Sequence, residues 1–135
     1  MGFFSDVFGK SDSEEDKKWA LYLALSRGLS MADGEITEDE MDFSVNYMKK
    51  NIKGITESRL NRICELSTKI DIGDFASKLT EKEKYELVYY MIGLANADGY
   101  FHGAELAVIV YFAVAHDLES EKILDYVLEN YEVDV

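Results

Sequence analysis

The chain contains no proline, one cysteine and two histidines among its 135 residues. Without proline, and with apolar residues at helical spacing, it is predicted to be all-α. A single thiol, Cys64, excludes an intramolecular disulfide and favours a reducing, cytoplasmic location. Long hydrophobic runs are also missing. The longest, residues 106–115, is about half the length of a membrane-spanning helix and predicts a helix buried on all sides.

Basic residues are scarce, because 14 Lys and Arg stand against 27 Asp and Glu and leave a net charge of −13. This balance argues against a nucleic-acid-binding protein, which needs cations to contact phosphates. It favours a partner protein with a basic surface, or divalent cations held by carboxylates. No nucleophile–base set and no glycine-rich nucleotide loop occurs in the sequence, so we expect no enzyme activity.

One short motif occurs twice. Residues 28–34 are GLSMADG and residues 93–99 are GLANADG. In each copy a glutamate follows the aspartate by seven residues, which pairs Asp33 with Glu40 and Asp98 with Glu105. A duplicated unit with two acidic groups predicts a site of four carboxylates near a pseudo-twofold axis.

The helical signals predict a compact bundle of about six to seven helices, built from two pseudo-symmetric helix–loop–helix–helix units. Residues 1–12 form a lead-in, and residues 13–135 form the helical domain, with repeat units at about 13–70 and 80–130. Capping boxes at residues 37–40 and 80–83 mark two helix starts. The helices are expected at about 14–31, 37–52, 56–67, 80–95, 103–116 and 120–131, with one short turn at 75–79.

The repeated motif matches the second half of an EF-hand calcium loop, in which Asp, Gly, an apolar residue and Glu occupy positions five, six, eight and twelve. Positions one and three would be Leu29, Met31, Leu94 and Asn96, and three of these side chains have no ligand oxygen. A true EF-hand is therefore excluded. Two half-loops that face each other could still bind Ca²⁺ or Mg²⁺ through Asp33, Glu40, Asp98 and Glu105. Alternatively, Asp-Gly is only a turn and each Glu only a cap partner. Both interpretations stay open.

The two A-D-G-x-(I/F)-x-x-x-E units, in a helical chain of this length that begins Met-Gly-Phe-Phe, resemble the TerB (tellurite resistance) family. The N-terminal domain of DjlA-type membrane co-chaperones is similar to it. The resemblance implies a compact helical bundle, a role in bacterial stress or tellurite resistance, and no catalytic activity. It also implies an acidic patch, carried here by Asp33, Glu40, Asp98 and Glu105.

Two functions follow as expectations. The first is an acidic scaffold that also binds a divalent cation at the paired loops, and the second is a protein–protein interaction module in which the acidic pairs only brace turns. Phe3, Phe4 and Phe8 could contact a membrane surface or a partner groove, or fold back onto the bundle. The sequence leaves the oligomeric state open.

Three further side chains invite an interpretation. His102 precedes a predicted helix and is expected to cap it or to complete a metal shell. His116 is expected at a helix C-terminus, where a partly charged imidazole would meet the negative end of the helix dipole. Cys64 is expected to be a buried, inert thiol.

Overall fold

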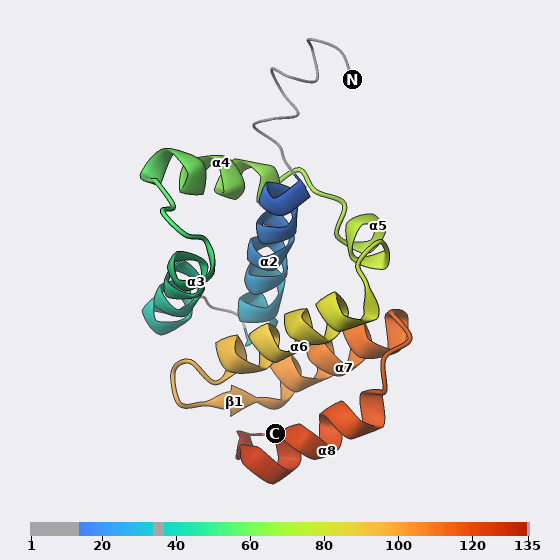
Figure 1. Ribbon diagram of the computed structural model, residues 1–135. Coiled ribbons are helices and arrows are strands. Elements are labelled where there is room, and N and C mark those ends of the chain that lie inside the picture. Colours follow the sequence, from blue (N-terminus) through green and yellow to red (C-terminus); the bar gives the residue numbers. More distant parts are fainter. Residues whose placement is uncertain (1–13, 34–36, 135) are drawn as a thin grey trace.

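A computed structural model describes residues 14–33 and 37–134 of the chain, and this part is almost entirely helical, as predicted (Figure 1). It contains a 3-10 turn, η1, at Met31–Asp33 and two strands of two residues each, β1 (Phe101–His102) and β2 (Val133–Asp134). The described residues form seven α-helices: α2 (Glu14–Ser30), α3 (Glu38–Asn51), α4 (Glu57–Ser67), α5 (Ile72–Ser77), α6 (Glu81–Ala95), α7 (Gly103–Ala115) and α8 (Ser120–Asn130).

Threonine side chains cap three of these helices. Thr37, Thr56 and Thr80 each accept a hydrogen bond from the backbone N–H three residues on. Both predicted capping boxes are present, since Glu40 and Glu83 bond back to the N-cap N–H groups. Local side-chain chemistry therefore sets where α3, α4 and α6 begin.

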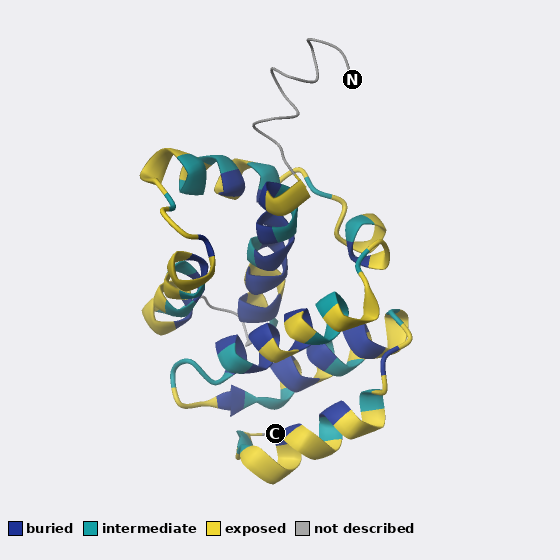
Figure 2. Ribbon diagram, in the orientation of Figure 1, coloured by how far each residue is buried: buried dark blue, intermediate teal, exposed yellow. Residues whose placement is uncertain are grey.

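Helix α2 is the centre of the bundle and contacts α3, α4, α5, α6 and α7. Its apolar stretch Trp19–Leu25 is buried apart from the half-buried Leu23, so almost every face of the helix has a neighbour (Figure 2). In Figure 1, α4 crosses the N-terminal end of α2, while α6 and α7 lie at its other end. The end of α2 that carries the first Asp-Gly motif is therefore directed toward the second unit.

The two units share their element order but differ in packing. Helix α4 packs mainly on α2, whereas α8, its counterpart, packs on α7. A parallel pairing of β1 with β2 accompanies this difference and sets Phe101 opposite Val133 and His102 opposite Asp134. The C-terminal strand thus holds the second loop.

Helix α7 corrects one expectation, because it is not buried on all sides. Tyr111 is 76% exposed and Val114 is 60% exposed. Neighbouring elements α2, α6, α8 and η1 cover the other faces and leave this one to solvent (Figure 2). Within residues 14–33 and 37–134, no helix combines the length and the apolarity needed to cross a bilayer.

Candidate functional site

The first copy of the motif lies at the end of α2. Asp33 closes η1, and its side chain, together with residues 34–36, lies outside the described part of the structure. η1 contacts α7, the helix that follows the second copy. The backbone at Asp33 is thus next to the second unit, and the shared site of four carboxylates stays a prediction.

Glu40 is the third residue of α3, and only 3% of it is exposed. Its Oε1 accepts hydrogen bonds from the N–H of Thr37 at 2.9 Å and from the Thr37 hydroxyl at 3.1 Å. In return, the N–H of Glu40 donates to Thr37 Oγ1 at 3.1 Å. The negative side chain also lies in the first turn, where the helix dipole favours it.

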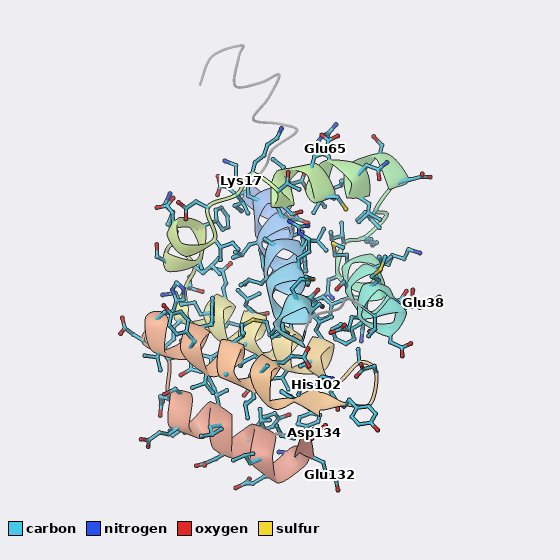
Figure 3. All side chains as sticks on the ribbon, turned by 180° about the vertical axis from the view of Figure 1, so that it is seen from behind. Lys17, Glu38, Glu65, His102, Glu132 and Asp134 are labelled. Carbon is cyan, nitrogen blue, oxygen red and sulfur yellow. The ribbon has the colours of Figure 1, made fainter. Side chains whose placement is uncertain are left out.

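Glu105 occupies the corresponding place in α7, and only 1% of it is exposed. Its Oε1 accepts a hydrogen bond from the backbone N–H of His102 at 3.3 Å. The His102 ring stacks 6.1 Å from the ring of Tyr100, and its strand pairs with Asp134, which is labelled with it in Figure 3. The equivalent glutamates of the two units are therefore both buried at helix N-termini.

Asp98 shapes the second loop. Its Oδ1 accepts a hydrogen bond from the N–H of Tyr100 at 2.9 Å, which forms a side-chain turn. Gly99 follows with φ of +84°, a conformation that side chains rarely adopt. The Asp-Gly pair is thus a local turn device, whatever else it does.

The described acidic side chains have the donor chemistry of a hard-cation site. Carboxylate oxygens are the ligands that Ca²⁺ and Mg²⁺ prefer. Local hydrogen bonds already engage a carboxylate oxygen of Glu40, of Asp98 and of Glu105. Among the described side chains, no group of three or more His, Cys, Asp or Glu is placed to hold a metal ion. A cation would therefore require the Asp33 loop as well.

Glu40 also lines a cavity that the sequence did not reveal. The cavity has a volume of about 260 Å³ and lies between α2, α3 and α4. Ser26, Ser44 and Tyr90 form a buried hydroxyl network beside it, in which Tyr90 Oη lies 2.6 Å from Ser26 Oγ and 2.9 Å from Ser44 Oγ. In the sequence, this hydroxyl network is indicated only by the serines that stand among apolar residues of α2 and α3.

The predicted burial of Cys64 is wrong, whereas His116 lies at the predicted helix C-terminus but has a lowered pKa. Cys64 is exposed rather than buried, because Ile63 takes the inward position on α4. His116 does follow α7, with its ring 4.5 Å from that of Phe112. Burial, with Lys84 as a second cause, lowers its pKa, so the neutral imidazole is favoured there. The predicted role of Phe3, Phe4 and Phe8 lies outside the described residues.

These features define the class of this protein: it is an all-α bundle of two related units, each with an Asp-Gly loop followed by a buried glutamate cap. The family model for tellurite resistance protein TerB matches residues 20–123. The chain belongs to the TerB family, and the resemblance seen in the sequence is confirmed. Comparison with curated proteins and comparison with solved structures gave no match.

Proposed function

We propose that this protein is a non-enzymatic acidic scaffold in bacterial stress or tellurite resistance, and that it binds Ca²⁺ or Mg²⁺ through Asp33, Glu40, Asp98 and Glu105. Family membership supports the link to tellurite resistance. The excess of acidic over basic residues supports a partner with a basic surface.

The burial of Glu40 and Glu105 carries the cation part of the proposal. A glutamate cap does not need burial, since Glu83 forms the same capping box at a half-exposed position of α6. Glu40 and Glu105 each accept a local hydrogen bond, and removing their charges from water is still costly. Both buried caps follow the repeated Asp-Gly motif, so burial coincides with the duplicated unit. A bound cation would offset the cost of removing these charges from water.

The second candidate is a protein-interaction module in which the acidic pairs only brace turns. It is favoured by the local hydrogen bonds, because Thr37, His102 and Tyr100 already donate to Glu40, Glu105 and Asp98. Under this alternative, the four carboxylates contribute to folding and to the surface charge, and no ion binds.

Thermal melting of metal-stripped protein separates the two candidates. A cation that binds only the folded state stabilises it, by about 2.7 kcal/mol at a concentration one hundred times Kd. We expect millimolar Ca²⁺ or Mg²⁺ to raise the melting temperature of the wild type. The increase should disappear in the double variant Asp33→Asn, Asp98→Asn and in the double variant Glu40→Gln, Glu105→Gln.

The matched control is Glu83→Gln, which changes the same type of cap away from the repeated motif. This variant should keep the full response to the cation. If the wild type melts at the same temperature with and without either ion, the proposal of cation binding is wrong. The second candidate, a protein-interaction module in which the acidic pairs only stabilise turns, is then favoured.

A further inference from the structure

A second feature lies away from the Asp-Gly loops, where α2, α3 and α6 meet. A surface hollow of about 350 Å³ is lined there by three aromatic side chains, Trp19, Tyr22 and Tyr47. The rings of Tyr22 and Tyr47 are stacked with centroids 6.0 Å apart, and Trp19 meets Tyr47 edge-on at 6.1 Å. Trp19 and Tyr22 are buried, whereas Tyr47 is half-buried and is the ring most open to solvent.

Charged and polar side chains surround this aromatic floor. Glu15, Glu86 and Asn51 are exposed, and Lys18 is half-buried. Burial raises the pKa of the Tyr47 hydroxyl, and the negative charge of Glu86 raises it further. Glu86, from α6, and Tyr47, from α3, line the same hollow.

The chain itself already places a cation on this surface. Lys18 Nζ lies 5.4 Å from the centroid of the Trp19 ring, within the range of a cation–π interaction. An aromatic floor with carboxylates at its edge is suited to a positively charged, partly apolar group. Glu15 is already paired with Arg59, whose Nη2 lies 3.2 Å from Glu15 Oε1, so we assign the attraction for a cationic ligand to Glu86.

We infer that this hollow binds the guanidinium group of an arginine from a partner protein, hydrogen-bonded to Glu86 and packed on the part of the Tyr47 ring that its stacking partners Tyr22 and Phe43 leave exposed. A guanidinium is planar, weakly hydrated and able to stack on an aromatic ring, whereas an ammonium holds its water more strongly. It can also donate two parallel hydrogen bonds to one carboxylate. The inference rests on the scaffold part of the proposed function, and names the partner's chemistry, but is independent of cation binding at Asp33 and Asp98.

Binding of N-acetyl-arginine amide, followed through the fluorescence of Trp19 and by calorimetry, tests the inference. Trp19 is the only tryptophan of the chain, so the signal reports on the hollow. The control ligand is N-acetyl-citrulline amide, which has nearly the same shape and no charge. We expect saturable binding of the arginine derivative and none of the citrulline derivative. Equal responses to both, or no response to either, would overturn the inference.

Variants give opposite expected shifts. Tyr47→Leu and Glu86→Gln should each weaken the binding of the arginine derivative, by roughly threefold to tenfold. Lys18→Gln should strengthen it, because the internal competitor for the aromatic surface is removed. Circular dichroism and melting curves check that each variant is folded.

Two control variants make the same charge changes outside the hollow. Glu81→Gln removes a carboxylate from an exposed position of α6, and Lys17→Gln removes an amine whose Nζ lies 3.5 Å from Glu14 Oε1. Both should bind the arginine derivative as the wild type does. If Glu81→Gln weakens binding as much as Glu86→Gln, or Lys17→Gln strengthens it as much as Lys18→Gln, general charge explains the result and the hollow is not the site.

An arginine–glycine peptide on beads separates failure of the hollow from failure of the scaffold. Retention of wild type and loss of Tyr47→Leu would support both proposals. Equal retention of wild type and of Tyr47→Leu would leave the acidic scaffold standing and overturn the hollow. Failure of the wild type to bind the peptide at low salt would contradict both.

Discussion

Arg59 Nε donates a hydrogen bond to Asp16 Oδ1 at 2.9 Å, and Arg59 Nη2 lies 2.8 Å from the same oxygen. The pair joins the first turn of α4 to the first turn of α2 across 43 residues of sequence. The Asp16 side chain is only 5% exposed, so the contact is shielded from water on one side. The hydrogen bond to Asp16 raises the pKa of Arg59 above its usual range. This contact holds the first turn of α4 against the first turn of α2.

Replacing Arg59 by Met should destabilise the fold by about 2–3 kcal/mol, because a buried carboxylate loses its cation and its charge-assisted hydrogen bonds. Urea denaturation measures the change. The control is Lys17→Met, which removes an exposed ion pair with Glu14 and should cost less than about 1 kcal/mol. Similar losses in the two variants would show that Asp16 and Arg59 behave as an ordinary surface pair.

Stability at alkaline pH should depend on Tyr22. Burial raises the pKa of Tyr22, and the charges of Tyr47 and Glu86 raise it further. Its folded-state pKa therefore exceeds the unfolded value of about 10, so its contribution is complete below that pH and is lost above it. We expect the free energy of unfolding to fall between about pH 9.5 and 11, and less steeply in Tyr22→Phe.

Tyr111→Phe is the matched control for this measurement, since it removes the same hydroxyl from the exposed face of α7. It should keep the steep wild-type slope. Identical slopes for Tyr22→Phe and wild type would show that Tyr22 is not the residue responsible.

His116 gives the opposite kind of pH dependence, on the acid side. Burial and the nearby Lys84 lower its pKa, while Asp117 opposes them. A folded-state pKa below the unfolded value of about 6.5 means that its contribution is complete above pH 6.5 and is lost as the pH falls toward the folded value. Wild type should therefore lose stability relative to His116→Gln between about pH 7.5 and 5.5, as measured by urea denaturation.

Lys84→Gln tests the cause, because it removes the charge that helps to lower the pKa of His116. The acid-side loss should then be smaller than in the wild type. A gain in wild-type stability over the same pH interval would instead indicate that the helix dipole dominates and holds the imidazole charged.

The helix order could be predicted from the sequence because its signals are local. Thr37 with Glu40, and Thr80 with Glu83, mark helix starts through bonds that span three residues. Exposure is different, because it depends on which helices come together. Cys64 was expected inside, but the adjacent Ile63 takes that position, and one residue along a helix turns the side chain by about 100°.

The candidate sites also combine features that the sequence predicts with features that arise only from packing. The sequence placed Glu40 and Glu105 as the third residues of two helices, but their near-complete burial depends on how the helices pack together. The aromatic hollow could not be found at all, because Tyr47 and Glu86 belong to different helices and meet only in the fold. Aromatic spacing along each helix indicated core positions and nothing more.

The glycines that open the two copies of the repeated motif, Gly28 and Gly93, should respond in opposite ways to alanine. A methyl group on Gly28 would meet nothing within 4 Å, so Gly28→Ala should stabilise the fold by about 0.5 kcal/mol through helix propensity. A methyl group on Gly93 would lie 2.7 Å from Cζ of Phe43, whose ring also packs against Tyr47 and Tyr90. Because that ring must shift, Gly93→Ala should destabilise by about 1–2 kcal/mol.

Thermal melting of both glycine variants, alone and combined with Phe43→Leu, tests whether contact with the ring is the cause. With the ring removed, Gly93→Ala should become neutral or stabilising. If it is as harmful beside Leu as beside Phe, contact with the ring is not the reason that α6 carries a glycine at this position.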